Sequence, residues 1–137
     1  MSAGRIEADW LDGADARAVT AALEGAGHQA LFVGGCVRNT LLGAPVTDLD
    51  LSTDARPARV IEVAEAAGLK AVPTGFEHGT VTLVHRHHPV EVTTFRADVE
   101  THGRHATVRF SDDVLEDARR RDFTMNALYC DSRGTIV

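Results

Sequence analysis

The chain has 137 residues, of which 44% are hydrophobic, and its formal net charge at pH 7 is −6. This length suffices for one domain with its own core, and the composition is that of a globular protein. The acidic balance argues against a module that holds nucleic acid through a basic surface of its own. No apolar run approaches the roughly 20 residues that cross a bilayer, and the first residues show no secretory signal, so we expect no membrane contact. The two distant cysteines, Cys36 and Cys130, predict reduced thiols in a cytoplasmic protein.

The first half of the sequence predicts helices and short strands in alternation. In chain order these are a helix over 14–26, a strand over 29–33, a short helix over 36–43, a strand over 49–52 and a longer helix over 54–68. In the longer helix, Asp54 is the expected N-cap and Pro57 suits the first turn.

The second half predicts more strand than helix. We expect a strand over 70–73, a hairpin of strands 79–85 and 90–95, a polar loop over 96–112, a charged helix over 112–123, an apolar segment over 125–131 and a turn over 132–135. Strands and helices mix without a regular β-α-β alternation. The sequence therefore predicts an α+β fold, with a mixed or antiparallel sheet of about five strands flanked by helices, in one domain over 1–137.

The stretch TDLDLST places two carboxylates on one short strand. Because strand side chains alternate between faces, Asp48 and Asp50 share one face, and Leu49 and Leu51 can anchor the other. Two neighbouring carboxylates repel, and Mg²⁺, which binds one or two carboxylates together with substrate phosphates, relieves that repulsion. The alternative is that both aspartates are solvated on an exposed strand, and this short motif alone does not decide between the two.

Two further motifs could place another carboxylate and phosphate-binding groups near the aspartates. Glu91 lies in the middle of a strand and would approach them if the hairpin lies beside their strand; otherwise it is an ordinary solvent-facing residue. Gly34 and Gly35 join a strand to a helix, whose N-terminus can bind phosphate, and Arg38 adds forked donors one turn later. The simpler interpretation of the two glycines is a tight turn that needs positive φ.

The segment RRRDFTMNAL has a structural and a functional interpretation. Arginines 119–121 near the end of a helix are favourable for the helix dipole, which is the simpler explanation. They could also bind the phosphates of a nucleotide, since guanidinium groups pair well with phosphate oxygens.

Five motifs follow one another along the chain: LFVGGCVRNTLLG, TDLDLST, GFEHGTVTLV, EVTTFR and RRRDFTMNAL. Together they resemble the class II tRNA nucleotidyltransferases, which comprise the CCA-adding enzymes and the related bacterial poly(A) polymerases. The resemblance covers roughly residues 30–131 and is closest to the CCA-adding branch. It implies a polymerase-β-like nucleotidyltransferase head without the family's neck, body and tail regions, which supply most of the tRNA-binding surface.

The resemblance also implies roles for individual residues. Asp48 and Asp50 match the metal ligands, and Glu91 matches a third catalytic acid. The implied nucleotide-binding residues are Gly34, Gly35, Arg38, Arg121, Asp122 and Asn126. The implied reaction transfers CMP or AMP from CTP or ATP to a tRNA 3′ end and releases pyrophosphate. One Mg²⁺ would acidify the RNA 3′-hydroxyl, and a second would hold the triphosphate.

Two positions depart from the family pattern: Asn39 stands where an aspartate is usual, and His102 stands where an acidic residue is expected. Asn39 bears on how the triphosphate is positioned. Because the resemblance places the residues that select the base in the missing regions, we expect this head alone to be weakly active or unselective between CTP and ATP. The alternatives are a non-catalytic head that binds metal and nucleotide, a bacterial poly(A) polymerase head, and transfer to a small molecule or a protein. The oligomeric state is left open.

Overall fold

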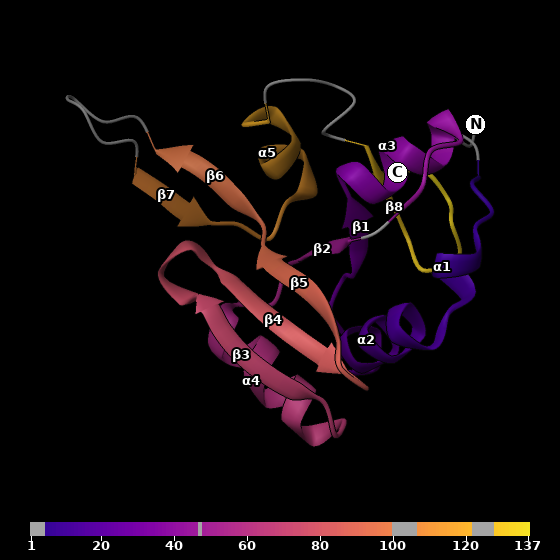
Figure 1. Cartoon of the computed structure of the whole chain (residues 1–137). Helices are drawn as coiled ribbons and strands as arrows, with labels where there is room; N and C mark the ends of the chain where they lie inside the picture. Colours follow the sequence, from indigo (N-terminus) through magenta and orange to yellow (C-terminus); the bar gives the residue numbers. More distant parts are fainter. Residues whose placement is uncertain (1–4, 47, 100–106, 122–127) are drawn as a thin grey trace.

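A six-stranded mixed sheet organises the computed structural model, which describes residues 5–46, 48–99, 107–121 and 128–137 (Figure 1). In spatial order its strands are β3 (Lys70–Gly75), β4 (Thr80–His85), β5 (His88–Thr94), β2 (Leu49–Thr53), β1 (Leu31–Val33) and β8 (Tyr129–Cys130). β2 and β5 run parallel, and the other neighbours pair antiparallel. The expected α+β class is confirmed, with six strands in this sheet instead of about five.

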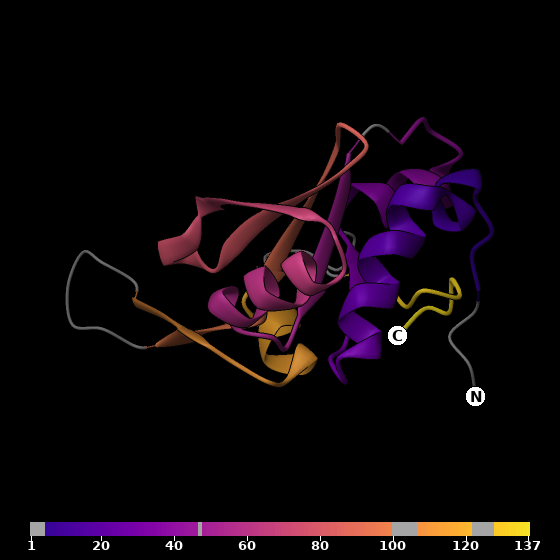
Figure 2. The same ribbon diagram turned by 90° about the horizontal axis from the view of Figure 1, so that it is seen from below.

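Helices α2 (Ala14–Gly25) and α4 (Pro57–Ala66) lie side by side on one face of the sheet (Figure 2). Helices α1 (Asp9–Asp12) and α3 (Gly35–Leu42) extend this layer. The strands turn their apolar side chains toward these helices, and the main core includes Leu23, Phe32, Leu51, Val60 and Val92, each at most 1% exposed. No helix in the described ranges is long and apolar enough to cross a membrane.

Helix α5 (Val114–Arg119) lies on the opposite face, at the end of the sheet formed by β1 and β8. Its Val114 and Ala118 pack against a second small core of Leu31, Val33, Phe95 and Tyr129. Away from α5, the strands on this face carry mainly polar side chains: Asp50, Ser52, Thr80, Thr82, Glu91 and Thr93. The candidate site lies on this polar part of the sheet.

A two-stranded antiparallel sheet projects from the main one (Figure 1). It consists of β6 (Arg96–Val99) and β7 (Thr107–Phe110), in which Arg96 faces Phe110. The expectation of a loop over 96–112 was therefore wrong for both of these segments. They form strands because they pair with each other and bury Ala97, at 4% exposure; RADV and TVRF do alternate polar and apolar residues, but each run is only four residues long.

The start of α4 also differs from the expectation. Its N-cap is Arg56, and Pro57 occupies the first turn as predicted, but no side chain caps the helix. Asp54 was therefore the wrong cap. Its carboxylate instead accepts the backbone N–H of Gln29 at 2.9 Å and lies 3.3 Å from His28 Nδ1, which ties the start of β1 to the segment after β2.

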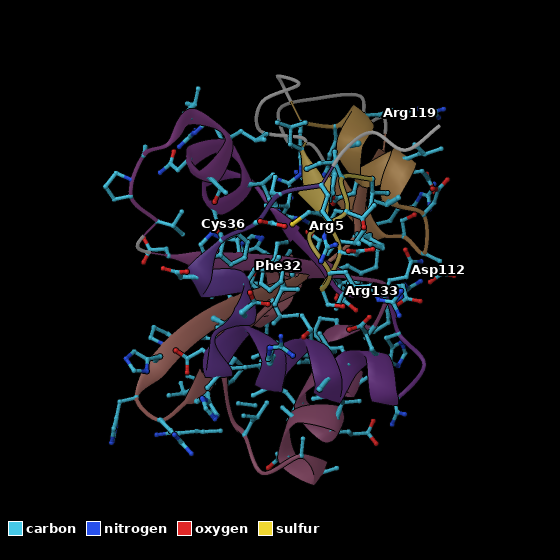
Figure 3. The ribbon with its side chains drawn as sticks, turned by 90° about the vertical axis from the view of Figure 1, so that its right-hand side faces the viewer. Arg5, Phe32, Cys36, Asp112, Arg119 and Arg133 are labelled. Atoms are coloured by element: carbon cyan, nitrogen blue, oxygen red, sulfur yellow. The ribbon has the colours of Figure 1, made fainter. Side chains whose placement is uncertain are left out.

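The two ends of the described chain meet beside α2. Ile6 donates its backbone N–H to the carbonyl of Gly134 at 2.8 Å, and Arg5 Nε donates to the carbonyl of Arg133 at 3.0 Å. Figure 3 shows Arg5 and Arg133 close together. This contact closes the domain at the edge where β8 joins the sheet.

Candidate active site

The parallel pairing of β2 and β5 places Asp50 directly opposite Glu91. Leu51, the next residue of β2, points into the core and is 1% exposed, so the alternation predicted for this strand is confirmed. Asp48 lies just before β2 and lines a cavity of about 340 Å³ together with Asp50 and Glu91; Leu49, Thr82 and Pro89 complete its lining. The structure thus brings together the three acidic residues that the sequence singled out.

The three carboxylates act on one another electrostatically. Partial burial, a hydrogen bond with Glu91 and the negative charges of Glu91 and Asp48 raise the pKa of Asp50 to about 6, while Arg121 acts in the opposite direction. Asp50 therefore binds a proton more readily than an ordinary aspartate does. A cation bound between these oxygens would relieve the same repulsion.

The Asp50–Glu91 pair also borders a second cavity, of about 240 Å³, on the side of β1. Gly34, Arg96 and Arg121 line this cavity, together with Val33, Leu51, Ser52, Thr80 and Thr93. Gly34 has φ 79° and ψ −132°, a backbone conformation that L residues with side chains avoid. The carboxylates therefore stand between a cavity lined by acids and a cavity lined by two arginines.

Arg121 is held firmly beside this second cavity. Its Nε donates to Asp117 Oδ2 at 3.2 Å and to the Tyr129 hydroxyl at 3.0 Å. Its guanidinium carbon also lies 5.7 Å from the centre of the Tyr129 ring. The end of the charged helix thus carries an oriented cation as well as a favourable charge for the helix dipole.

Arg38 and Gly35 lie in the first turn of α3. A Cβ added to Gly35 would stand 3.5 Å from Arg38 Nη2, so the guanidinium lies over the glycine. Arg38 Nε donates to Asn39 Oδ1 at 3.3 Å, and Asn39 Nδ2 donates to the carbonyl of Pro45 at 3.0 Å. Neither Arg38 nor Gly35 is among the described residues that line the two cavities.

Two predicted nucleotide-binding residues, Asp122 and Asn126, lie outside the described residues, as does His102. In the ranges that are described, no group of three or more His, Cys, Asp or Glu side chains is arranged as a metal site. The donors that are present nevertheless suit Mg²⁺, because this ion keeps several water molecules and uses one or two carboxylates plus substrate phosphates. Neighbouring carboxylates that repel one another are the kind of donors whose repulsion a bound cation would relieve.

Sequence reasoning missed Arg96, Asp117 and Tyr129. Arg96 lines the second cavity, while Asp117 and Tyr129 orient Arg121. The signals available were weak: Arg96 ends the motif EVTTFR, and Asp117 stands four residues before Arg121 on a helix. These residues come close together only because β8 and β6 pack around α5.

Comparison with known proteins supports the family resemblance that the motifs indicate. A profile of the family described as the Poly A polymerase head domain matches residues 30–137. The CCA-adding enzyme of Geobacillus thermodenitrificans (strain NG80-2) is 46% identical over 113 residues, which make up 81% of this chain and 27% of that enzyme.

Solved structures agree in fold. The CCA-adding enzyme of Bacillus stearothermophilus in complex with CTP is 41% identical, with a TM-score of 0.75, over 87% of this chain and 27% of that one. A tRNA nucleotidyltransferase complexed with a primer tRNA and an incoming ATP analog is 31% identical, with a TM-score of 0.63, over 87% of this chain and 33% of that one. The chain thus spans about 27% of the length of the CCA-adding enzymes that it matches here. The polymerase-β-like head expected from the motifs is confirmed as the fold.

Proposed function

Because the chain belongs to the Poly A polymerase head domain family, we propose that it is the nucleotidyltransferase head of a CCA-adding enzyme. The proposed reaction transfers CMP or AMP from CTP or ATP to the 3′ end of a tRNA and releases pyrophosphate. One observation supports it most directly: the Asp50–Glu91 pair stands between an acid-lined cavity and an arginine-lined cavity. Such a reaction needs two neighbouring places, one for the attacking 3′-hydroxyl and one for the triphosphate.

In this proposal the arginine-lined cavity receives the triphosphate. Arg121 and Arg96 supply positive charge, and the backbone of Gly34 lets the phosphates come close to the start of α3. Gly35 and Arg38 lie one step further along α3, and Asp122 and Asn126 follow Arg121 in the sequence. We assign these residues to nucleotide binding by their motif positions.

The acid-lined cavity receives the RNA 3′-hydroxyl. Its oxygen attacks the α-phosphorus, the bond between the α-phosphorus and the oxygen bridging to the β-phosphate breaks, and pyrophosphate leaves. Glu91, which stands opposite Asp50 and lines the same cavity, is the carboxylate placed to accept the hydroxyl proton. Positioning and charge neutralisation account for most of the catalysis of phosphoryl transfer, so no covalent intermediate with the protein is needed.

Asp48 and Asp50 are the residues that would hold Mg²⁺ in this site, with Glu91 beside them. When bound, the metal lowers the pKa of the attacking hydroxyl and neutralises charge on the phosphates. The protein's part is to keep the carboxylates on one face of a strand whose other face is locked in the core. We further propose a cytoplasmic location, with which the two buried free thiols agree.

Asn39, in place of the usual aspartate, is an argument for a non-catalytic head, but the structure weakens that argument. Asn39 still accepts a hydrogen bond from Arg38, so the contact that an aspartate would make there is retained in neutral form. A poly(A) polymerase head shares the catalytic residues and differs in the regions that select the base. Comparing CTP with ATP as the donor nucleotide addresses that alternative.

The test is nucleotide incorporation by the chain itself. Labelled CTP or ATP, Mg²⁺ and a tRNA lacking its 3′ end are incubated with the wild-type chain and with the Asp48→Ala, Asp50→Ala double variant. Glu62→Gln is the matched control, since Glu62 lies on α4, over the other face of the sheet. We expect weak incorporation that the double variant loses and the control keeps.

Two results would count against the proposal. Equal incorporation by the double variant would show that the chemistry lies elsewhere. A wild-type chain that binds neither CTP nor ATP in the presence of Mg²⁺ would exclude nucleotide transfer by this head. Binding without incorporation would favour the non-catalytic head.

A further inference from the structure

Asp117 is a buried carboxylate with an unusually complete set of donors. It lies on α5, is 1% exposed, and accepts hydrogen bonds from four groups. These are the Tyr129 hydroxyl at 2.6 Å, the backbone N–H of Arg96 at 2.9 Å, Arg121 Nε at 3.2 Å and Arg120 Nη2 at 3.3 Å. Burying a charge is costly unless it is fully paired, so this site keeps its carboxylate by surrounding it with donors.

Two of the four donors belong to residues that line the arginine-lined cavity. Arg96 is bound through its backbone at the start of β6, and Arg121 is bound through Nε one helical turn after Asp117. Asp117 therefore ties two separate segments of the chain to one point beside the cavity. Its carboxylate lies behind the arginines and is not itself among the described residues that line the cavity.

The way Arg121 is held leaves its phosphate-binding end available. Both hydrogen bonds recorded for its side chain among the described residues use Nε. The Tyr129 hydroxyl accepts one of them and donates in turn to Asp117, while its ring lies beside the guanidinium. Held at Nε and against a ring, a guanidinium has a fixed plane, and its two Nη groups form the fork that matches phosphate oxygens.

We propose that Asp117 and Tyr129 are positioning residues that hold Arg121 and the Arg96 backbone in the orientation that binds the polyphosphate of a nucleotide. The inference rests on the proposed function for the identity of the nucleotide, but the binding of a polyphosphate can be tested without any transfer reaction. Neither residue is expected to touch the ligand. Their effect passes through the orientation of the arginines.

Positioning and simple electrostatics predict opposite results for one substitution. Asp117→Asn removes a negative charge close to an anion-binding cavity, so charge alone would make polyphosphate bind more tightly. If Asp117 acts by positioning, the same change releases Arg121 and binding weakens. Tyr129→Phe alters no charge and keeps the ring, so it isolates the hydroxyl contact.

The experiment measures the dissociation constants of inorganic tripolyphosphate, CTP and CMP by calorimetry, with Mg²⁺ present, for the wild-type chain and three variants. Asp117→Asn and Tyr129→Phe remove parts of the network. Glu116→Gln is the matched control, because it also breaks an ion pair of α5, the one with Arg109 at 2.6 Å, without touching Arg121. Circular dichroism sets the temperature at which each variant is fully folded.

We expect about tenfold weaker tripolyphosphate and CTP binding in Asp117→Asn, where a charged partner is lost, and about fivefold weaker binding in Tyr129→Phe. CMP binding should change less than either, and Glu116→Gln should match the wild type. If Asp117→Asn does not fold, Tyr129→Phe decides the question by itself.

The inference and the proposed function fail in different ways. Tripolyphosphate binding that is unchanged or tighter in the folded variants overturns the positioning role, whatever the transfer activity of the wild type. A wild-type chain that binds no tripolyphosphate overturns it as well. In a third outcome, the wild type binds tripolyphosphate, the two variants bind it more weakly, and the chain transfers no nucleotide. That result supports the positioning role and counts against the proposed reaction.

Discussion

Asp50 and Glu91 are direct partners across a parallel strand pair, and Glu91 raises the cost of ionising Asp50. Ordinary strand pairs avoid like charges in this position because the pairing is destabilised. The fold holds them there through the apolar residues on the other side of both strands, Leu51, Val90 and Val92, each at most 1% exposed. The core therefore supplies the free energy that keeps two repelling groups together.

Glu91→Gln tests whether the repelling pair lowers stability while it supports activity. The substitution removes the charge that faces Asp50, so we expect the melting temperature to stay the same or rise. Nucleotide incorporation should fall by about a hundredfold or more, since a carboxylate that accepts the hydroxyl proton or stands beside the metal ion is lost. Glu62→Gln, whose side chain is 68% exposed on α4, is the control for removing a surface charge. A variant that loses stability together with activity would contradict the proposed repulsion.

Mg²⁺ should stabilise the folded chain through the aspartates. A ligand at ten times its Kd adds about 1.4 kcal/mol to the free energy of unfolding, which is roughly 5 °C in melting temperature for a domain of this size. We expect this shift for the wild type and its loss in Asp50→Asn, measured by thermal unfolding. Matching the ionic strength with NaCl controls for general screening, and an equal shift in both proteins would place the metal elsewhere.

Gly34→Ala should affect both stability and binding. Gly34 has φ 79° and ψ −132°, and a Cβ there meets no atom within 4 Å, so the cost is backbone strain of about 1–3 kcal/mol. Because Gly34 lines the arginine-lined cavity, the added methyl group should also weaken CTP binding.

Gly43→Ala is the matched control for that variant. Gly43 ends the same helix with φ 73° and ψ 17°, has equally open space around its Cβ position, and is not among the cavity-lining residues described above. It should lose about 1 kcal/mol of stability and keep its CTP affinity. Equal loss of CTP affinity in both variants, compared in urea unfolding and calorimetry, would mean that strain in α3 is the cause.

Asn39→Asp should change nucleotide binding little. Asn39 already accepts a hydrogen bond from Arg38, and its amide group donates to the carbonyl of Pro45, a bond that a carboxylate cannot make. The stronger pairing with Arg38 and the lost bond to Pro45 act in opposite directions. We expect the KM for CTP to move by less than about threefold. A large rise in activity would show that Asn39 limits this head.

Asp117 should make the protein sensitive to acid. Burial alone would raise the pKa of Asp117, but hydrogen bonds from Tyr129 and from the Arg96 backbone, with the charges of Arg121 and Arg120, lower it overall. A carboxyl group with a lowered pKa in the folded state stabilises the protein above its unfolded pKa, near 3.9. That contribution is lost as pH falls from about 4 through the lower folded value.

Urea unfolding between pH 7 and pH 3 measures this effect. Asp117→Asn should cost roughly 3 kcal/mol at pH 7, because it breaks a buried ion pair, and the difference from wild type should shrink below pH 4. Asp112→Asn is the control, since the Asp112 side chain is 81% exposed and pairs with Arg56 on the surface. A constant difference at every pH would rule out titration of Asp117 as the cause.

The acidic site could be predicted from the sequence because its signal is local. Alternation of Asp48, Asp50 and the neighbouring leucines fixes which face of the strand carries charge. The partner strand could not be fixed in the same way, since β2 and β5 meet through a parallel crossover that local patterns do not specify. Glu91 was a candidate only on the condition that the hairpin lies beside β2, and the structure meets that condition.

The parts that sequence reasoning missed depend on contacts between distant segments. Asp117 stands in a charged run and reads as a surface residue, yet Tyr129 from β8 and Arg96 from β6 close over it. The strands β6 and β7 each alternate polar and apolar residues over only four positions, too short a run to stand out within a polar segment, and they form because each provides the other's backbone partners. Asp54 was a reasonable cap by residue type, but its carboxylate binds the backbone of Gln29 across the fold.

The parallel pairing of β2 and β5 also sets when the site can first exist. Between the strands that carry Asp50 and Glu91, the chain forms α4, β3 and β4 before it returns. Closing such a loop costs entropy, and contacts distant in sequence form late in folding. A growing chain on the ribosome therefore has no acidic pair until β5 has emerged. Binding of a nucleotide by this head would then indicate that the chain from β2 to β5 has folded.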